Sequence, residues 1–482
     1  MRSITRRRFL EDSMLAAAAA AAAAPPLPGW AHQEQKPGSP GNRLRVAVLG
    51  CRVRGRQHAQ ELGHLPDCEI VYVCDPDQEL VSELAVAVEK QQGKAPKAVR
   101  DMRRVFDDRA VDAVFIATPN HWHALAAVWA MQAGKDVYVE KPVSHNLREG
   151  RRIVEVARRT GRLCQGGTQN RSNRALAAAI DYLRQGKLGQ VRLARSIVYG
   201  PRGSIGGPGA YEIPAQVDYN LWAGPAPLSP LTRPQFHYDW HWFWETGNGE
   251  LGNNNVHSLD ICRWGLGLTG LGCSVLSYGG RLGYRDAGQT PNTQVVIFDF
   301  GDKTIISETR GLKSAPFRPG LKDGWIFEGS NGFIAGTSLF DPAGKLVSTF
   351  SGKDESHFAN FLKAVRSRKR EDLNADILEG HLSAGLCHLG NISWRLGRAV
   401  SPADLRRELA ELKVPENVLE TLDRTEQHLR DNQVDLEQTK LVLGQRLRFD
   451  GAGEAFRDLP QANAADALLT REYRPPFVLP GA

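Results

Sequence analysis

The chain has 482 residues, of which 41% are hydrophobic and 24% charged, with 48 glycines and 27 prolines. This composition is close to the average of soluble globular proteins, which excludes a disordered, collagenous or disulfide-dense chain, and the length predicts two or three domains. The net charge of +7 is spread along the sequence rather than gathered into one block, so no nucleic-acid-binding arm is expected.

Residues 1–31 have the composition of an export signal rather than of a folded domain. A basic start that contains TRRRFL (Thr5–Leu10) precedes an alanine-rich stretch, Met14–Ala24, and small residues up to Ala31. The apolar stretch is too short to cross about 30 Å of hydrocarbon as a helix, so no stable membrane anchor is expected. The arginines resemble the twin-arginine signal, which implies a periplasmic or otherwise exported protein. Residues 32–42 are then a linker.

The cysteines indicate neither a metal site nor a disulfide framework. They lie at positions 51, 68, 74, 164, 262, 273 and 387, with no Cys-x-x-Cys pair and no His/Cys cluster at zinc spacing. Most fall in apolar stretches, where cysteine behaves as a small core residue. We therefore expect no bound metal.

Residues 43–165 alternate short apolar strands with helical stretches, the first of which begins at about Gln57. The predicted strands are Leu44–Leu49, Glu69–Cys74, Val111–Ala117 and Asp136–Val139. Buried strands separated by helices of about a dozen residues are typical of a parallel sheet with helices on both faces. The fold class is therefore α/β, with a dinucleotide-binding (Rossmann) domain at the N-terminus.

The turn after the first strand carries a glycine motif that suits a dinucleotide. Gly50 and Gly55 stand at the first and last positions of a G-x-G-x-x-G pattern, and Asp75 ends the next strand. In such folds the turn holds the pyrophosphate at a helix N-terminus, and the acidic residue bonds the ribose hydroxyls. An acid there repels a 2′-phosphate, so NAD is favoured over NADP. Arg52 replaces the middle glycine, so its side chain must either contact the pyrophosphate or turn away from it.

Three further stretches resemble one family. TPNHWH (Thr118–His123), AGKDVYVEKP (Ala133–Pro142) and GELGNNNVHSLD (Gly249–Asp260) are similar to motifs of the glucose–fructose oxidoreductase/inositol dehydrogenase/MocA (Gfo/Idh/MocA) family. The resemblance implies a second, α/β domain with a mostly antiparallel open sheet, here residues 166–400. It also implies a sugar or polyol substrate and a homo-oligomer.

By this resemblance Lys141 is the catalytic lysine. A lysine at the end of a buried strand, near the positive nicotinamide ring, has a lowered pKa and can accept the proton of an alcohol. His257 is the second catalytic candidate. The family commonly has Asp four residues before this histidine, where this chain has Asn253. The remaining cofactor-binding candidates are Thr118, Pro119, Asn120, His123 and Glu140.

Gln169 and Arg171 offer donors for a polyhydroxylated substrate. Downstream, His237–Trp244 places three tryptophans at a period of two, on one face if the segment is a strand. Trp240 could then stack on the C–H face of a sugar, although such rows more often pack in a core.

The rest of the second domain is expected to be structural. Thr293–Phe300 and Lys303–Thr309 predict a hairpin, followed by strands over Trp325–Glu328 and Phe333–Leu339. His357–Arg368 and Asp376–Leu396 predict amphipathic helices. Residues 401–482 predict a helical hairpin, at 402–440, and an extended tail.

Three functions remain open. The first is an exported oxidoreductase that acts on a carbohydrate through a tightly bound NAD, because free NAD is scarce outside the cytoplasm. The second is a glycoside hydrolase or lyase that recycles NAD by oxidation, elimination and reduction. The third is a carbohydrate-binding protein without catalysis.

Overall fold

The structure is a computed structural model that describes residues 43–318, 321, 323–411, 417–450, 454–457 and 462–481. The export signal and linker predicted for residues 1–42 lie outside the described residues. All seven cysteines are free, and only Cys273 is exposed.

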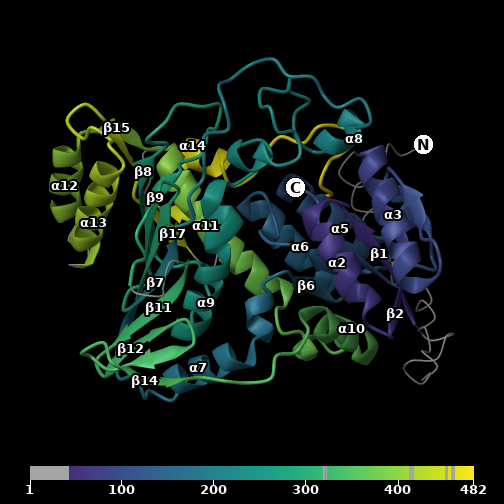
Figure 1. Cartoon of the computed structure of the whole chain (residues 1–482), viewed down its shortest axis with the longest axis horizontal. Helices are drawn as coiled ribbons and strands as arrows, with labels where there is room; N and C mark the ends of the chain where they lie inside the picture. The colour runs from purple at the N-terminus through teal and green to yellow at the C-terminus, as the bar shows by residue number, and fades with distance from the viewer. Residues whose placement is uncertain are drawn as a thin grey trace, which may run out of the picture. The chain divides into compact units, whose positions relative to one another are not determined.

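The N-terminal domain is a parallel six-stranded sheet with the order β3-β2-β1-β4-β5-β6. Its central strands have almost no exposed side chains, as expected for a sheet covered on both faces. Its strands are β1 (Leu44–Leu49), β2 (Cys68–Cys74), β3 (Lys97–Val99), β4 (Ala113–Ile116), β5 (Asp136–Val139) and β6 (Cys164–Gly166), and its helices are α2 (Val53–Gly63), α3 (Gln78–Gln92), α4 (Arg103–Asp107), α5 (His123–Gln132) and α6 (Leu147–Thr160). The predicted Rossmann architecture is confirmed (Figure 1).

Helix α2 begins at Val53 rather than near Gln57, which corrects the sequence-based boundary. Gly50, with φ +92°, makes the turn, and a Cβ on Gly55 would lie 1.7 Å from the Gly50 carbonyl oxygen. The first turn of α2 packs so tightly against the end of β1 that only glycine fits there. The last glycine of the motif, Gly55, therefore lies within the helix.

The second domain is built on a twelve-stranded sheet in the part of the chain that the structure describes. Neighbouring strands are antiparallel except β7 and β10, which are parallel. Its strands are β7 (Val191–Val198), β8 (Ser274–Gly280), β9 (Thr293–Asp299), β10 (Thr304–Arg310), β11 (Asp323–Gly329), β12 (Gly332–Ala335), β13 (Ser338–Phe340), β14 (Leu346–Thr349), β15 (Arg398–Val400), β16 (Leu441–Leu443), β17 (Leu447–Asp450) and β18 (Ala455–Arg457). The expected mostly antiparallel α/β domain is confirmed, and so is the β9–β10 hairpin.

One strand prediction is wrong. The stretch Phe333–Leu339 is divided between β12 and β13, which pair with each other across a turn at Gly336, where φ is +60°. An apolar run that continues through a tight turn looks like a single strand in sequence because the turn is only two residues long.

Both faces of the large sheet are covered by helices. One face packs against α7 (Arg174–Arg184), α9 (Val256–Leu266) and α11 (Ile377–Arg395). The opposite face packs against the hairpin of α12 (Pro402–Glu411) and α13 (Asn417–Asp431). Helix α10 (His357–Ser367) instead covers the Rossmann sheet, through Phe358 and Phe361. The chain therefore returns to its N-terminal domain after building most of the second one.

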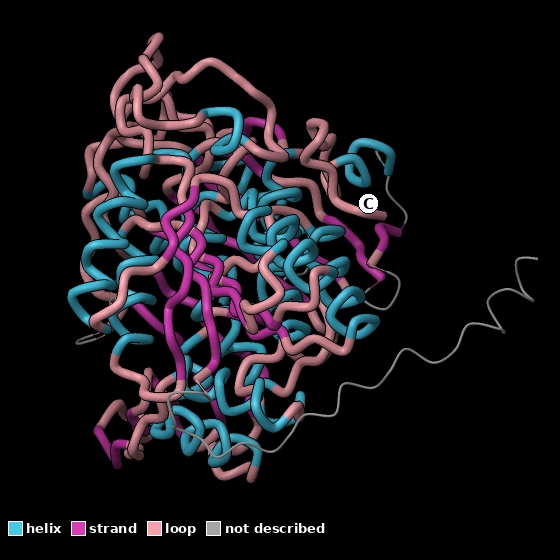
Figure 2. The backbone as a smooth tube through the Cα atoms, turned by 90° about the vertical axis from the view of Figure 1, so that its right-hand side faces the viewer, coloured by secondary structure: helices cyan, strands magenta, loops and turns pink. Residues whose placement is uncertain are grey.

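Long loops between residues 199 and 255 bring the second domain to the carboxyl ends of the Rossmann strands, and they gather at the top of the view in Figure 2. They carry only short helices: α8 (Tyr219–Ala223), η3 (Asp239–Trp242) and the π-helical turn η4 (Leu251–Asn255). The tail that follows α14 (Ala462–Ala467) packs Phe477 against Trp122 and Trp129 of the N-terminal domain.

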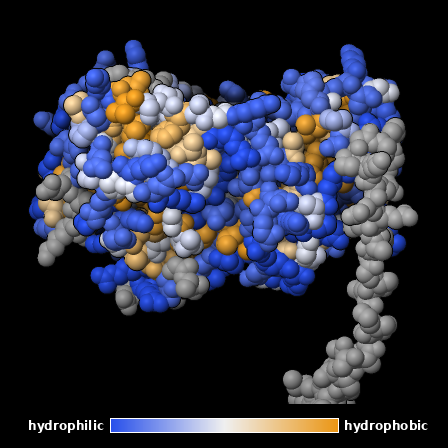
Figure 3. Space-filling model, turned by 90° about the horizontal axis from the view of Figure 1, so that it is seen from below, coloured by the Kyte–Doolittle hydropathy of each residue, from blue (hydrophilic) through white to orange (hydrophobic). Residues whose placement is uncertain are grey.

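None of the described helices is long and apolar enough to cross a membrane. On the face that Figure 3 shows, hydrophobic side chains lie in separate patches among hydrophilic ones.

Candidate active site

A cavity of about 310 Å³ lies where the Rossmann strands end and the loops of the second domain meet them. This is the edge of an α/β sheet at which ligands bind, and the volume lies in the range of ligand pockets. Most of the residues predicted from sequence to bind cofactor or substrate line it: Gly50, Arg52, Asp75, Thr118, Pro119, Asn120, His123, Glu140, Lys141, Trp240 and Asn253.

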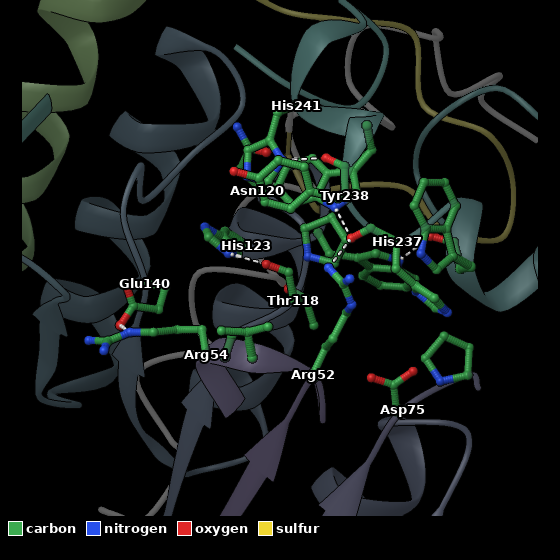
Figure 4. A pocket seen from close by; sticks show the side chains of 18 of the residues that line it. Arg52, Arg54, Asp75, Thr118, Asn120, His123, Glu140, His237, Tyr238 and His241 are labelled. Carbon is green, nitrogen blue, oxygen red and sulfur yellow. Dashed lines mark hydrogen bonds and ion pairs between the residues drawn. The ribbon is translucent and has the colours of Figure 1, made fainter. Parts of the chain in front are cut away.

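The glycine turn has the shape that a dinucleotide requires. At Gly50 a Cβ would lie 2.5 Å from the Ala117 carbonyl oxygen, so a side chain has no room between the two strand ends. Arg52 does not fold back on the turn. Its side chain extends towards the loop of the second domain and donates from Nη1 to the His237 carbonyl at 3.0 Å (Figure 4).

Asp75 is buried beside the same turn. Its carboxylate accepts the Cys51 N–H at 2.7 Å and the Asp77 N–H at 2.9 Å. Burial raises the pKa of Asp75 to about 6. A carboxylate has about four acceptor positions, so after these two bonds Asp75 can still accept ribose hydroxyls.

Glu140 is fixed by two side chains from α2. Its Oε1 accepts from Arg54 Nε at 2.6 Å and lies 2.9 Å from His58 Nε2. Although burial alone raises it, these partners hold the pKa of Glu140 well below its usual range. Sequence analysis did not single out Arg54 and His58, but their i, i+4 spacing on a helix places both on one face.

Lys141 projects into the cavity from the end of β5. Its Nζ donates to the Asn253 carbonyl at 2.7 Å, within the π-helical turn. Burial lowers the pKa of Lys141, and the neighbouring Glu140 partly opposes this. π-helical turns are rare and frequent at functional sites. The arrangement holds an amine with weakened proton affinity at the cavity wall.

Two buried oxygens at the cavity have no hydrogen-bond partner within the described residues, Thr118 Oγ1 and Asn120 Oδ1. A buried polar atom without a partner is costly unless a ligand or water satisfies it. The neighbouring His123 ring lies between two carbonyls, 2.6 Å from that of Pro142 and 2.8 Å from that of Thr118, and joins these two loops. The residues present therefore fit a bound dinucleotide.

His237–Trp244 is not a strand, which corrects the sequence-based interpretation. It contains the short helix η3, so the three tryptophans do not share a face. Trp240 lines the cavity, Trp242 is buried, and Trp244 packs near Trp394.

The same segment supplies three cavity residues that sequence analysis missed, His237, Tyr238 and His241. The His241 ring stacks on Trp240, with 3.7 Å between ring centroids, and its Nδ1 lies 2.6 Å from the Tyr238 carbonyl. A carbonyl only accepts, so Nδ1 carries the proton and Nε2 presents a lone pair. Burial lowers the pKa of His241 to about 3, so the ring is neutral at neutral pH and binds a proton only weakly.

His257 does not line the cavity, and its catalytic role stays a prediction. Its Nδ1 is buried without a hydrogen-bond partner among the described residues. Burial, together with the charge of Lys141, lowers its pKa to about 3. The Asn253 side chain faces Glu250 at 3.4 Å, so an acidic group does stand near this turn, three residues before the position where the family commonly has Asp.

Arg171 and Gln169 are not among the cavity residues. Arg171 is buried and forms ion pairs with Asp260 at 2.8 Å and with Glu379 at 3.1 Å. These carboxylates, from α9 and α11, balance its charge within the fold, and its role in substrate binding stays a prediction. Gln169 is exposed.

No metal site accompanies the cavity. The described residues contain no group of three or more His, Cys, Asp or Glu side chains that could hold a metal ion.

Comparison with known proteins agrees with this geometry. Residues 44–168 match the Gfo/Idh/MocA oxidoreductase family, NAD-binding Rossmann fold, and residues 208–429 match the C-terminal α/β domain of the same oxidoreductase family. The chain belongs to the Gfo/Idh/MocA family. Its N-terminal domain is an NAD-binding Rossmann domain.

Among curated proteins, an α-N-acetylgalactosaminidase from Shewanella oneidensis is 28% identical over 152 residues, which is 31% of this chain and 33% of that protein. A glycosyl hydrolase family 109 protein from Shewanella pealeana is 30% identical over the same length. The chain thus matches about a third of the length of these relatives.

Among solved structures, the WlbA dehydrogenase from Bordetella pertussis in complex with NADH and UDP-GlcNAcA has a TM-score of 0.53. It is 20% identical, and the match covers 72% of this chain and 96% of that one. At this identity the likeness shows the fold.

Proposed function

We propose that this member of the Gfo/Idh/MocA family is an NAD-dependent oxidoreductase that oxidises a hydroxyl-bearing carbon of a sugar, polyol or sugar derivative. The observation that carries the proposal is Lys141, an amine with lowered pKa held in the cavity that also contains the dinucleotide turn. The WlbA dehydrogenase, solved with a nucleotide sugar, supports the substrate class.

Different residues of the cavity would bind the cofactor and accept the proton of the substrate. The turn at Gly50 and the N-terminus of α2 would hold the pyrophosphate, and Asp75 the ribose. Bound NAD supplies the acceptor for a hydride from the substrate carbon. Lys141 takes the hydroxyl proton, for which a base with a pKa near the working pH is most effective. Glu140 keeps its charge next to Lys141 and so prevents burial from lowering the pKa of the lysine further.

The first experiment denatures the purified protein and identifies any released nucleotide by mass spectrometry. We expect NAD in near-stoichiometric amount. The protein is then incubated with a panel of sugars and a second carbonyl acceptor, with Lys141→Met as the variant. We expect oxidised product from the wild type and none from Lys141→Met, which still contains NAD. A wild-type protein that neither contains nor binds a dinucleotide contradicts the proposal.

A second candidate is a glycosidase that oxidises a ring hydroxyl, eliminates the glycosidic substituent, adds water across the double bond so formed and returns the hydride, or a lyase that omits the addition of water. Elimination requires a base for the C–H next to the oxidised carbon in addition to the base for the hydroxyl, and His241 is an unprotonated ring that lines the cavity besides Lys141. The Shewanella α-N-acetylgalactosaminidase is consistent with this chemistry. Aglycone release without net formation of NADH, with deuterium from D₂O entering the sugar, distinguishes this candidate from the dehydrogenase. Sugar binding without any turnover would indicate the non-catalytic binding protein.

We also propose that the protein is exported and forms a homo-oligomer. The pattern of residues 1–31 supports export. Cell fractionation of the wild type and of an Arg6→Lys, Arg7→Lys variant tests it, because the twin-arginine receptor reads these side chains. Light scattering of the purified protein measures the oligomeric state.

A further inference from the structure

Arg52 joins the cofactor turn to the second domain across the mouth of the cavity. It is the residue immediately before α2, it is exposed, and its Nη1 donates to the His237 carbonyl at 3.0 Å. Trp240 Nε1 donates to the same carbonyl at 3.1 Å, which fixes its direction. In Figure 4 the Arg52 side chain spans the distance between the turn and the loop of His237 and Tyr238.

A second link closes the same side of the cavity. His237 Nε2 lies 2.8 Å from Asp77 Oδ2, and Asp77 also caps α3 through its other oxygen. Next to it, the backbone of Gln78 donates to the Gln216 carbonyl at 3.1 Å. The loop that follows β2 and begins at Asp75 is therefore tied to the second domain at two points, His237 and Gln216. A dinucleotide bound at the turn would lie beneath these links.

We propose that Arg52 is a cofactor latch, which bonds the pyrophosphate of NAD and, through His237, keeps the second domain closed over it. This inference rests on the proposed function and deepens it: the cofactor stays bound from one turnover to the next.

The chemistry of the side chain suits this role. In G-x-G-x-x-G turns the middle glycine lets the backbone approach the pyrophosphate. Arginine at this position brings five donors and a permanent charge, and within the described residues the His237 carbonyl takes up one of them. Guanidinium and phosphate form charge-assisted, often bidentate hydrogen bonds. The substitution therefore exchanges close backbone contact for a cation that also reaches the second domain.

Arg52→Gly distinguishes the latch from an ordinary turn. The variant completes the glycine motif. If the turn alone holds NAD, Arg52→Gly should bind NAD as tightly as the wild type or more tightly. If Arg52 is a latch, NAD should leave Arg52→Gly about 10- to 100-fold faster than the wild type, because one or two hydrogen bonds to a charged group are lost. Arg52→Gln keeps the length without the charge and should resemble Arg52→Gly. Asp77→Asn, which can still cap α3, should accelerate release by a smaller factor.

The assay loads each full-length protein with NADH, adds a large excess of NAD and follows the loss of protein-bound NADH fluorescence. Arg56→Gln is the matched control, since Arg56 lies on α2 but pairs with Glu83, and neither residue lines the cavity. Thermal unfolding without nucleotide verifies that each variant is folded. Release from Arg52→Gly at the wild-type rate overturns the latch and leaves the proposed function intact. A wild type that binds no dinucleotide overturns both.

Discussion

The buried carboxylate of Glu140 links the stability of the site to its chemistry, and Glu140→Gln tests both. The substitution keeps the size of the side chain and removes its charge. Arg54, His58 and the Lys141 backbone N–H all face this carboxylate. We expect a less stable protein in which the pKa of Lys141 lies lower still.

The size of the first effect and the sign of the second follow from the structure. Breaking a buried ion pair costs about 3–5 kcal/mol. The value here should lie near the lower end, about 3 kcal/mol, because the glutamine oxygen still accepts one hydrogen bond and Arg54 is 35% exposed to water. For a domain of this size that corresponds to a decrease in Tm of about 6–12 °C. Removing a negative charge next to Lys141 should lower its pKa further.

The sign of the pH dependence is fixed by the pKa of Glu140, which lies below its ordinary value of 4.5. The stabilisation by Glu140 is complete at pH values above its ordinary pKa and is lost as the pH falls through the lower pKa that Glu140 has in the folded protein. The part of the difference in unfolding free energy between wild type and Glu140→Gln that comes from the titration of Glu140 should therefore be constant from pH 8 to about 5, and the whole difference should grow as the pH falls and Lys141 takes up its proton, because the pKa of the lysine is lower in the variant. If it vanishes in this range, the ion pair does not stabilise the fold.

Turnover tests the second effect. The rate should rise with pH as Lys141 loses its proton, and in Glu140→Gln this rise should move to lower pH. Asp136→Asn is the control, because Asp136 is a buried, ion-paired carboxylate at the opposite end of the same strand. It should lower the Tm without moving the pH profile. A profile of Glu140→Gln that coincides with the wild type, or moves to higher pH, refutes the reasoning about Lys141.

Three further outcomes are expected. The pKa of Asp75 is about 6, so its carboxylate is charged above that pH. The preference for NAD over NADP, measured as a ratio of Kd values, should therefore shrink between pH 8 and pH 5. A constant ratio would mean that Asp75 does not select the cofactor. Gly55→Ala should lower the free energy of unfolding by about 3 kcal/mol or more in a denaturant titration, since its Cβ would clash with the Gly50 carbonyl. Gly93→Ala is the control, because a Cβ there meets open space, and it should lower the free energy of unfolding by about 1 kcal/mol. If the protein is the glycosidase or lyase, His241→Gln should reduce turnover by about 100-fold or more while the NAD content of the protein stays unchanged. Turnover at the wild-type rate would exclude His241 as a base and is the result expected of the dehydrogenase.

The Rossmann half of the site could be predicted because its signals are local. The strands are short apolar runs, and the residues that line the cavity there follow directly after strand ends, as Asp75 and Lys141 do. In a parallel sheet every such position lies at the same edge, so the order of elements alone brings the residues together.

The contribution of the second domain could not be predicted in the same way. His241 and Tyr238 reach the cavity from a loop with little regular structure, whose path depends on contacts such as that of His237 with Asp77, far away in sequence. The aromatic spacing of His237–Trp244 could not show whether the segment is a strand, because periodicity carries no information on short 3₁₀ turns. The ion pairs of Arg171 could not be predicted for a similar reason, since its partner Glu379 lies on a helix 208 residues later.

Asn253, which stands where the family resemblance leads us to expect Asp, offers a last test that runs in the opposite direction to Glu140→Gln. Lys141 is held by the backbone carbonyl of Asn253 and not by its side chain. Asn253→Asp should therefore leave Lys141 in place, while it adds a carboxylate beside Glu250, whose charge already raises the pKa of the lysine. The added charge should raise the pKa of Lys141 and move the rise of the pH–rate profile to higher pH. Opposite shifts in the two variants, measured on one substrate, would identify Lys141 as the group whose proton controls turnover. Shifts in the same direction would show that the proton of Lys141 does not control turnover.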